Sequence, residues 1–499
     1  MKAASPVPTA MTIRRFTLAA YVLAGALALP TAAAEDDELV LRPALTLTFP
    51  ASPAPLTAAQ YQDLPPLLEL RKSGNPPGHL PEPVMTLSTV VRRVLEQHPD
   101  IRSSQALLNA AEERIVQSRS NYYPTVGLET QALDAQDDQL GRPLDRTTRT
   151  TDAFLRWNLF RGFGDRQGVR MTEHDREAAD ADLAETHERV ALQVAQAYLE
   201  VFRLRYMLAL GEDYIADHLR LSEDVRKRVD AGRVSAADLD EVRASLIQAE
   251  LQQSQLRGQL RGAEQRFWLL ADMNPGKLTE PVLDDTPATM SVDALMEDVR
   301  LGNRRVRGAL ERASARTEEV GVAAAALYPS LNVEVRRRLS SSIDPVPVTD
   351  TKDATQFQVT YEMPLGGASF SRRREAVERM LAAGAAADTE LLRARAELVQ
   401  VWAGWQEARK IAPRLAERVD AQDMVVRAYD LQFAAARRSL TDLINARADR
   451  YRARGDLLDN RIEQLAASVR VLNLLGRLRE HLLSAATPAP ETLKTAFRP

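Results

Sequence analysis

The sequence predicts a mainly helical protein with a small β part, built from two tandem copies of one unit. The first observation is a duplicated segment: residues 231–244 and 435–448 share seven of fourteen aligned positions, where chance gives about one. The second is apolar residues recurring every 3.5 positions on average, the spacing of coiled coils. The third is four short stretches in which apolar and polar residues alternate, as in strands with one apolar face.

The composition supports this fold class and excludes several functions. Charged residues make up 27% of the 499 residues and aromatic residues only 5%, a balance typical of long helices rather than large α/β enzymes. The formal net charge of −4 argues against nucleic acid as a partner. There are six histidines and no cysteine, and the spacings of metal ligands, nucleophilic triads and phosphate loops are missing. We therefore expect no metal, no cofactor and no enzymatic activity.

The N-terminus has the pattern of a secretory signal over residues 1–34. Two arginines precede an apolar run, and small residues then lead to Glu35, where the mature chain is expected to begin. Met1 and Met11 both fit as start sites. No later stretch reaches the eighteen or so apolar residues that a membrane-spanning helix needs.

Two stretches are expected to lack fixed structure. Residues 35–84 contain ten of the 27 prolines and predict a largely disordered leader, whose role the sequence does not indicate. Residues 484–499 predict a disordered tail.

The first copy spans residues 85–280. Helical spacing predicts two helices, alternation predicts two strands joined by a polar loop, and heptads predict a long helix and a return helix. The expected ranges are 86–97, 100–122, 125–133, 152–160, 165–230 and 239–270.

The second copy, residues 281–483, repeats this order. A helix is expected over 292–327 and strands over 331–337 and 355–363, followed by a long helix and a return helix. Pro413 lies inside the long helix and predicts a bend or local unwinding there, because proline removes one backbone hydrogen bond.

The duplicated segment lies between the long helix and the return helix of each copy. Ser235 and Asp238 fit the capping-box pattern, in which a hydroxyl caps the new helix and an acid three positions later bonds back. Ser439 and Asp442 fit the same pattern. Each copy is therefore expected to turn sharply here.

Four strands with one apolar face cannot close a membrane barrel alone, because even small barrels need about eight strands. If these strands face lipid, their edges must pair with other copies of the chain. Two, three or four chains would supply 8, 12 or 16 strands, and spacing does not choose among them.

The order of elements resembles that of the outer-membrane efflux proteins typified by TolC, over residues 86–480. The resemblance rests on the duplicated plan, on the Tyr-Pro pairs at 123–124 and 328–329, on the glycine-containing exits at 159–162 and 364–367, and on the repeated turn. It implies a homotrimer with a 12-stranded barrel in the outer membrane and a helical tunnel through the periplasm of a Gram-negative cell.

The resemblance also implies partners and a function. The tunnel would meet a periplasmic adaptor, also called a membrane fusion protein, and an inner-membrane ABC or other transporter, while outer-membrane lipid surrounds the barrel. The chain would then be the exit duct of a tripartite export system. The absence of a cysteine for lipid anchoring favours type I protein secretion. A multidrug efflux channel is the alternative, and a periplasmic coiled-coil scaffold or adaptor is the alternative from another class.

The resemblance places the pore constriction at the second turn. Asp442 matches the position of a ring of carboxylates, one per chain, which makes a narrow aperture that attracts cations. The family has a second acid three residues later, but this chain has Asn445, so that ring is expected to be neutral. The alternative is that Asp442 only completes its capping box.

A closed-state latch is the second implied site. Asp238 matches an acid that links neighbouring coils to a tyrosine and an arginine of the second turn, and these partners fall on Phe433 and Arg438. Because Phe433 lacks a hydroxyl, the latch would depend mainly on Asp238 and Arg438, an ion pair that contributes about 0 to 1 kcal/mol when exposed. The alternative is a set of solvated turn charges.

Adaptor docking is the third implied site. Gly232 with Arg233, and Ala436 with Arg437, stand at the turn positions that receive the adaptor's helical tips. Alanine in place of glycine at 436 would narrow the groove at the second turn.

Overall fold

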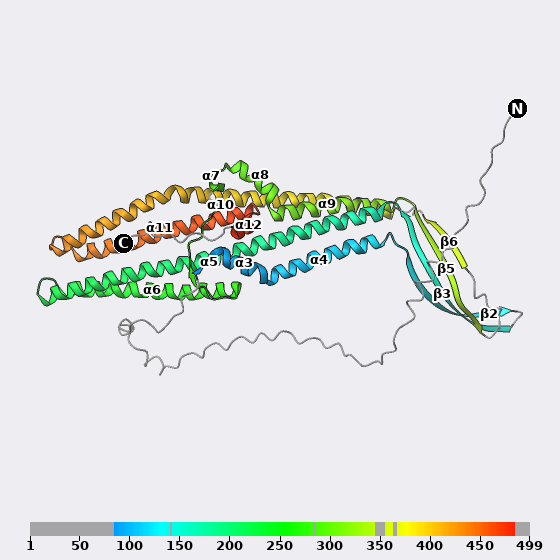
Figure 1. The fold of residues 1–499 in the computed structure, drawn as a ribbon, viewed down its shortest axis with the longest axis horizontal. Coiled ribbons are helices and arrows are strands. Elements are labelled where there is room, and N and C mark those ends of the chain that lie inside the picture. Colours follow the sequence, from blue (N-terminus) through cyan, green and yellow to red (C-terminus); the bar gives the residue numbers. More distant parts are fainter. Residues whose placement is uncertain (1–83, 140–141, 284–285, 345–354, 363–366, 485–499) are drawn as a thin grey trace, which may run out of the picture. The chain divides into compact units, whose positions relative to one another are not determined.

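The computed structural model describes residues 84–139, 142–283, 286–344, 355–362 and 367–484. The predicted signal, leader and tail lie outside these residues, except for Val84 and Ser484 at their inner ends. Figure 1 shows how the described helices and strands follow one another.

The same order of elements occurs twice along the chain (Figure 1). The first series is α3 (Leu87–Gln97), α4 (Pro99–Ser120), β2 (Thr125–Gln139), β3 (Arg142–Arg161), α5 (Gly164–Asp230) and α6 (Ala236–Ala271). The second series is α8 (Val292–Gly302), α9 (Arg304–Ala325), β5 (Ser330–Asp344), β6 (Thr355–Glu362), α10 (Ala368–Ala434) and α11 (Leu440–Leu474). Helices α5 and α10 have 67 residues each, which corresponds to about 100 Å at 1.5 Å per residue.

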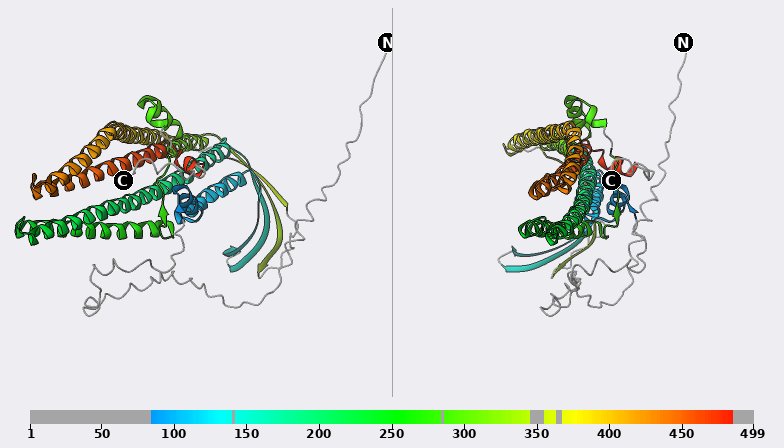
Figure 2. Two further views of the ribbon diagram at one scale, coloured as in Figure 1. Left: turned by 60° about the vertical axis from the view of Figure 1, so that its left-hand side comes forward. Right: turned by 90° about the vertical axis from the view of Figure 1, so that its left-hand side faces the viewer.

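Short elements complete the fold. Strands β1 (Val84–Met85) and β4 (Lys277–Leu278) pair in parallel, and the helices α7 (Thr286–Thr289) and α12 (Leu478–Ser484) follow the first and second series. Helix α5 packs against α4, α6, α9 and α11, and α10 packs against α9 and α11 (Figure 2). The α5/α6 pair therefore contacts the α10/α11 pair along α5 and α11.

The apolar heptads of the long helices are confirmed as the buried face. Val190, Val194, Val201 and Leu204 are fully buried on α5, and Leu398 is fully buried on α10. Burial of each such side chain contributes about 1.5 to 3 kcal/mol. Aromatic side chains of the same two helices contribute to this buried face: Tyr198, Phe202 and Trp405 are buried, and Trp402 is half-buried.

The single helix expected over 292–327 is wrong, because it is broken into α8 and α9 at Asn303. The Asn303 side chain accepts a hydrogen bond from the Val306 backbone N–H (3.2 Å) and donates one to the Leu474 carbonyl (2.9 Å). A short polar side chain thus caps a new helix where periodicity alone suggests continuity. In the first series His98 caps the start of α4 in the same way, because its Nδ1 accepts a hydrogen bond from the Asp100 N–H (3.2 Å).

Of the bend or local unwinding expected at Pro413, the unwinding is wrong. Helix α10 runs without a break from Ala368 to Ala434 with Pro413 inside it. Proline therefore produces no local unwinding here, although α10 is visibly curved along its course (Figure 2).

The four longer strands form one antiparallel sheet in the order β2-β3-β5-β6. Three of the four strands are longer than predicted, because the polar segment between β2 and β3 continues the ladder instead of forming a loop, and β5 extends to Asp344. Alternation marks only the part of a strand with one apolar side, whereas backbone hydrogen bonds extend the ladder beyond it. β6 is described to Glu362, one residue short of the expected end.

The register confirms the predicted apolar face. Val126 lies opposite Leu155, Leu155 opposite Val335, and Val335 opposite Phe357. Chain exit from β3 requires Gly162, whose φ of +57° is left-handed and whose added Cβ would lie 2.4 Å from the Ala325 carbonyl oxygen.

Candidate gate at the paired helical turns

The two helical turns have the same backbone geometry. The first turn joins α5 to α6 through Gly232 (φ +62°), and the second joins α10 to α11 through Ala436 (φ +57°). The Arg233 N–H bonds the Arg228 carbonyl (2.8 Å), and the equivalent Arg437 N–H bonds the Gln432 carbonyl (2.8 Å). These bonds satisfy carbonyls at the helix ends that would otherwise lack partners. Each long helix begins beside the sheet, so both turns lie at the ends remote from it.

Asp238 acts as a cap within its own turn. Its carboxylate accepts a hydrogen bond from the Ser235 backbone N–H (2.9 Å), and the Ser235 hydroxyl accepts one from the Ala237 N–H (3.1 Å). The capping box predicted at the first turn is thus confirmed. Within the chain, neither a hydrogen bond nor an ion pair joins Asp238 to Arg438, both of which the structure describes.

Asp442 and Arg438 pair with each other across one helical turn. The guanidinium Nη1 of Arg438 lies 3.6 Å from Oδ2 of Asp442, whose side chain is half exposed. The Arg438 guanidinium also lies over the Tyr429 ring, 3.9 Å from its centroid. The Ser439 hydroxyl caps the Asp442 N–H (3.1 Å), and Asn445 is exposed on the same first turns of α11. The carboxylate of Asp442 therefore stays partly open to solvent.

Phe433 is a core residue at the second turn. It is 8% exposed and packs with Leu221, Val225 and Val242 of the first series. Arg228 at the end of α5 covers the Phe433 ring, 4.6 Å from its centroid, and donates to the Phe433 carbonyl (3.1 Å). Phe433 therefore joins the two coiled coils through packing and a cation–π contact instead of a hydroxyl.

The turn tips that were predicted for docking are open to solvent. Gly232, Arg233, Ala436 and Arg437 are all exposed in the single chain. A further cross-turn contact joins their helices, since the Thr441 hydroxyl donates to Glu241 (2.8 Å). The tips thus present two arginines beside two small residues.

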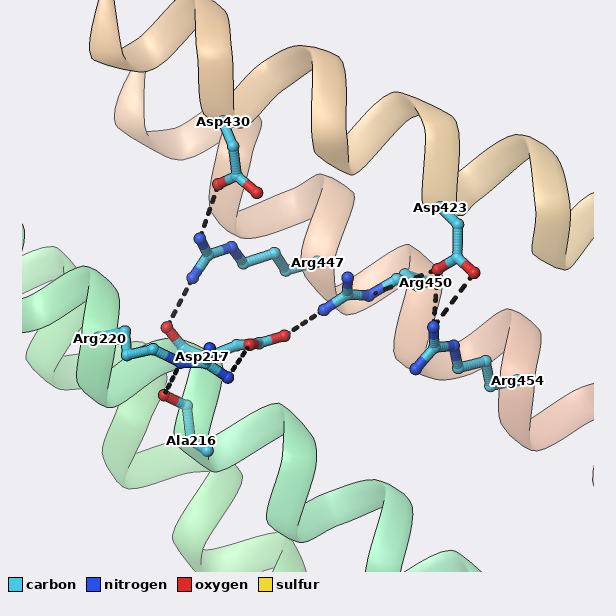
Figure 3. Close-up of polar contacts among 8 residues, drawn as sticks. All are labelled: Ala216, Asp217, Arg220, Asp423, Asp430, Arg447, Arg450 and Arg454. Atoms are coloured by element: carbon cyan, nitrogen blue, oxygen red, sulfur yellow. Dashed lines mark hydrogen bonds and ion pairs between the residues drawn. The ribbon is translucent and has the colours of Figure 1, made fainter. Parts of the chain in front are cut away.

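An ionic cluster joins the α5/α6 pair to the α10/α11 pair (Figure 3). Arg450 of α11 bonds the Asp217 carboxylate of α5 and lies 3.9 Å from Asp423 of α10. Arg447 donates to the Asp217 carbonyl (2.6 Å) and to the Asp430 carboxylate (2.7 Å).

The same cluster extends along both helix pairs. Arg454 bonds Asp423 (2.9 Å), and Arg220 bonds the other oxygen of the Asp217 carboxylate (2.9 Å). The side chains of Arg447, Arg450 and Asp217 are 11%, 19% and 21% exposed, so water screens these pairs less than a surface pair.

His218 lies next to this cluster and is fully buried. Neither ring nitrogen has a hydrogen-bond partner among the described residues, and the ring meets Tyr214 edge-on at 4.4 Å. Burial, followed by the nearby positive charge of Arg447, lowers the pKa of His218 to about 4. His218 is therefore neutral near pH 7.

The positions of the two turns were predicted from the sequence, but the ionic cluster was missed. A signal existed: Arg447, Arg450 and Arg454 recur at steps of three and four, which places them on one helix face. Their acids on α10, Asp423 and Asp430, stand seven residues apart on one face too.

These features define a class of protein. The chain has two pairs of long helices, and each pair ends in a capped turn. At the other end, each pair follows strands whose apolar face is exposed in the single chain. This is the plan of an outer-membrane channel subunit. The chain belongs to the outer membrane efflux protein family, whose model matches residues 90–270 and 295–477. The TolC-like resemblance is confirmed.

Named relatives agree with this assignment. The chain is 22% identical over 401 residues to the outer membrane efflux protein BepC of Brucella suis. The aligned part covers 79% of this chain and 86% of BepC. The fold is similar to that of the Campylobacter jejuni CmeC outer membrane channel, with a TM-score of 0.70 and 15% identity. The match covers 79% of this chain and 86% of the CmeC chain. The Vibrio cholerae outer membrane protein VceC gives a TM-score of 0.69 at 16% identity, covering 78% of this chain and 96% of VceC.

Family membership establishes the general role. The protein is an outer-membrane efflux channel that extends into the periplasm, and members of this class transport substrates rather than catalyse reactions. In the part of the chain that the structure describes, no helix is both long and apolar enough to cross a membrane.

Proposed function

We propose that three copies of this chain close a 12-stranded barrel in the outer membrane and a helical tunnel in the periplasm, forming the exit duct of a tripartite export system. The observation that carries this proposal is the sheet. Its outer strands β2 and β6 each have one neighbour among the described strands, so each leaves an edge for another copy. Unpaired edges are not tolerated in hydrocarbon, so barrel closure must come from pairing between chains.

The apolar face of the sheet supports the same proposal. Val126, Leu128, Phe357, Val359 and Tyr361 are each more than 60% exposed in the single chain. A contiguous face of this kind is costly in water but favourable against lipid. Trp157 and Tyr361 lie on this face and fit the aromatic belt at the membrane interface.

The gate is proposed to be the ring of turns. Asp442 would supply one carboxylate per chain at the constriction, with Asn445 as the neutral second ring. Asp238 and Arg438 of neighbouring chains would form the latch, after each leaves its present partner. Phe433 would hold the two coils of one chain together from within the core.

The partners are proposed from the same geometry. The exposed tips at Gly232, Arg233, Ala436 and Arg437 offer small residues and positive charge to the helical tips of a periplasmic adaptor. An inner-membrane ABC or other transporter would deliver substrate behind that adaptor.

Oligomeric state and location test the duct directly. The full-length chain is 55.3 kDa, so the detergent-extracted protein should have about three times the mass of one processed chain and should fractionate with the outer membrane. Recovery as a soluble periplasmic monomer would instead support the coiled-coil scaffold alternative.

The exported substrate has two candidates. Type I protein secretion is the first, and multidrug efflux is the second, favoured by the word efflux in the name of the relative BepC. Deleting the gene separates them. Loss of a secreted polypeptide with unchanged drug tolerance supports secretion, and drug sensitivity with an unchanged set of secreted proteins supports efflux.

A further inference from the structure

A cluster of charged side chains lies on the polar face of the sheet, opposite the apolar face described above. It crosses three neighbouring strands, with one residue on β2, two on β3 and three on β5. The members of this cluster, called the charge ladder below, are Glu129, Asp152, Arg156, Glu334, Arg336 and Arg338.

Arg336 is the centre of the charge ladder. Its Nη1 lies 2.6 Å from Glu129 of β2 and 3.6 Å from Asp152 of β3, and its Nη2 lies 2.8 Å from Glu334 on its own strand. One guanidinium therefore contacts all three acids of the charge ladder.

The other two arginines complete the charge balance. Arg156 pairs with Glu334 at 2.9 Å, and Arg338 pairs with Asp152 at 3.2 Å. Asp152 is only 7% exposed although it carries a charge, because arginines approach it from β5. Three carboxylates thus face three guanidinium groups, and the charge ladder has no net charge.

The sheet is shaped to hold this arrangement. The Phe154 ring lies between two arginines, with the Arg156 and Arg336 guanidinium groups 5.2 and 5.9 Å from its centroid. Gly127 on β2 leaves room for that ring, because an added Cβ there would lie 2.5 Å from Cζ of Phe154. Arg156 and Arg336 therefore contact an aromatic ring as well as their carboxylate partners.

We propose that the charge ladder neutralises the lumen wall of the barrel, so that this part of the pore does not select between cations and anions and Arg336 is the residue that keeps it neutral. This inference rests on the proposed function, since it requires that the apolar face meets lipid and the polar face meets the water-filled lumen. Ion selectivity of the duct is then set elsewhere, at the turns.

The physical reason is electrostatic. A wall potential of one kT changes the local concentration of a monovalent ion about threefold, and symmetry repeats each unpaired charge in every chain of the ring. An uncompensated charge on the ladder would therefore add a selectivity step that the wild-type protein lacks.

The test is the reversal potential of the purified full-length oligomer in planar lipid bilayers under a KCl gradient. Arg336→Gln leaves one excess negative charge per chain. Because one kT enriches cations about threefold and depletes anions about threefold, the cation-to-anion permeability ratio should rise about sevenfold. Glu129→Gln leaves one excess positive charge and should lower the ratio. The double variant should return to the wild-type value.

A matched control lies one residue away. Arg337 is opposite Ala153 on the other face of the same strand, so Arg337→Gln changes the same charge outside the lumen and should leave the ratio unchanged. Glu129→Gln provides an independent reading if Arg336→Gln does not assemble, because Glu129 lies on a different strand and its side chain is half exposed.

Two results would count against the inference and are distinguishable. If wild-type protein conducts but the Arg336 and Glu129 variants both keep its reversal potential, or both shift it in one direction, the charge ladder does not neutralise the lumen. If wild-type protein forms no conducting channels at all, the proposed duct itself fails.

Discussion

At the scale of single residues, the two turns differ where the backbone is left-handed. Gly232 adopts this conformation freely, whereas Ala436 adopts it with a Cβ, which costs roughly 1 to 2 kcal/mol. A Cβ added to Gly232 would meet no atom within 4 Å, so the strain would be purely conformational. The strain is thus confined to the turn that carries Asp442.

Exchanging these two residues gives the first prediction. Ala436→Gly should raise the free energy of unfolding by about 1 kcal/mol, and Gly232→Ala should lower it by a similar amount. Urea unfolding of the detergent-extracted protein, followed by helical circular dichroism, measures both. Changes of the same sign in the two variants would show that left-handed strain does not govern these turns.

The buried His218 gives the second prediction. Its pKa of about 4 in the folded state lies below 6.5, the ordinary value, so the unfolded chain binds the extra proton between these two pH values. The contribution of neutral His218 to the free energy of unfolding is therefore fully present above pH 6.5. It is lost as the pH falls towards 4, and the loss is at most about 3 kcal/mol. His218→Phe should remove that loss. An unchanged difference between pH 7 and pH 5 in the variant would refute the assignment.

At the scale of elements, the long helices and the turns between them were predictable, but the strand ends and the contacts between the helix pairs were not. The heptads predict α5 and α10 because the apolar residues that become buried recur at a regular spacing within one segment of sequence. The ends of β2 and β3 were missed because backbone pairing, not side-chain alternation, continues the ladder into Thr147 to Thr151. The Arg447 contact to Asp217 spans 230 residues, so one helix's spacing cannot reveal it.

The ionic cluster between the helix pairs gives the third prediction. Arg450→Gln leaves the partly buried Asp217 carboxylate with fewer partners and should weaken the α5–α11 contact by about 1 to 3 kcal/mol. Amide hydrogen exchange in the two turns should become faster. Arg452→Gln is the matched control, because Arg452 is exposed and pairs with Asp449 of its own helix. Equal exchange in both variants would rule out a bridging role for Arg450.

The anchoring of α12 gives the fourth prediction. The Glu188 carboxylate accepts hydrogen bonds from the Leu478 N–H (3.1 Å) and the Arg479 N–H (3.2 Å), and burial raises its pKa to about 7. The folded chain thus binds the extra proton between pH 4.5 and 7, so stability falls as pH rises through this window.

Glu188 and His218 oppose each other between pH 4.5 and 6.5, so variants are needed to separate them. Glu188→Gln should leave a urea midpoint that rises between pH 5 and 6.5, because His218 then acts alone, and His218→Phe should leave a midpoint that falls more steeply between pH 5 and 7 than in wild type. A decline that persists in Glu188→Gln would mean that another group is responsible.

At the scale of the whole molecule, family membership and the duplicated plan could be predicted from one sequence, because the turns and the strand entries recur in both copies. The state of the candidate gate could not. Asp238, Arg438 and Asp442 bond within their own turns in a single chain, and a latch between chains depends on contacts that only an assembled oligomer makes.

The most direct measurement of the central claim is the single-channel conductance of the purified full-length protein in planar bilayers, for wild type and for Asp442→Asn. Wild-type protein should show uniform conductance steps with a preference for cations, and Asp442→Asn should lose that preference while it keeps the conductance. Cation preference that is unchanged in Asp442→Asn would contradict the constriction at the second turn, and the absence of conductance in wild type would contradict the duct.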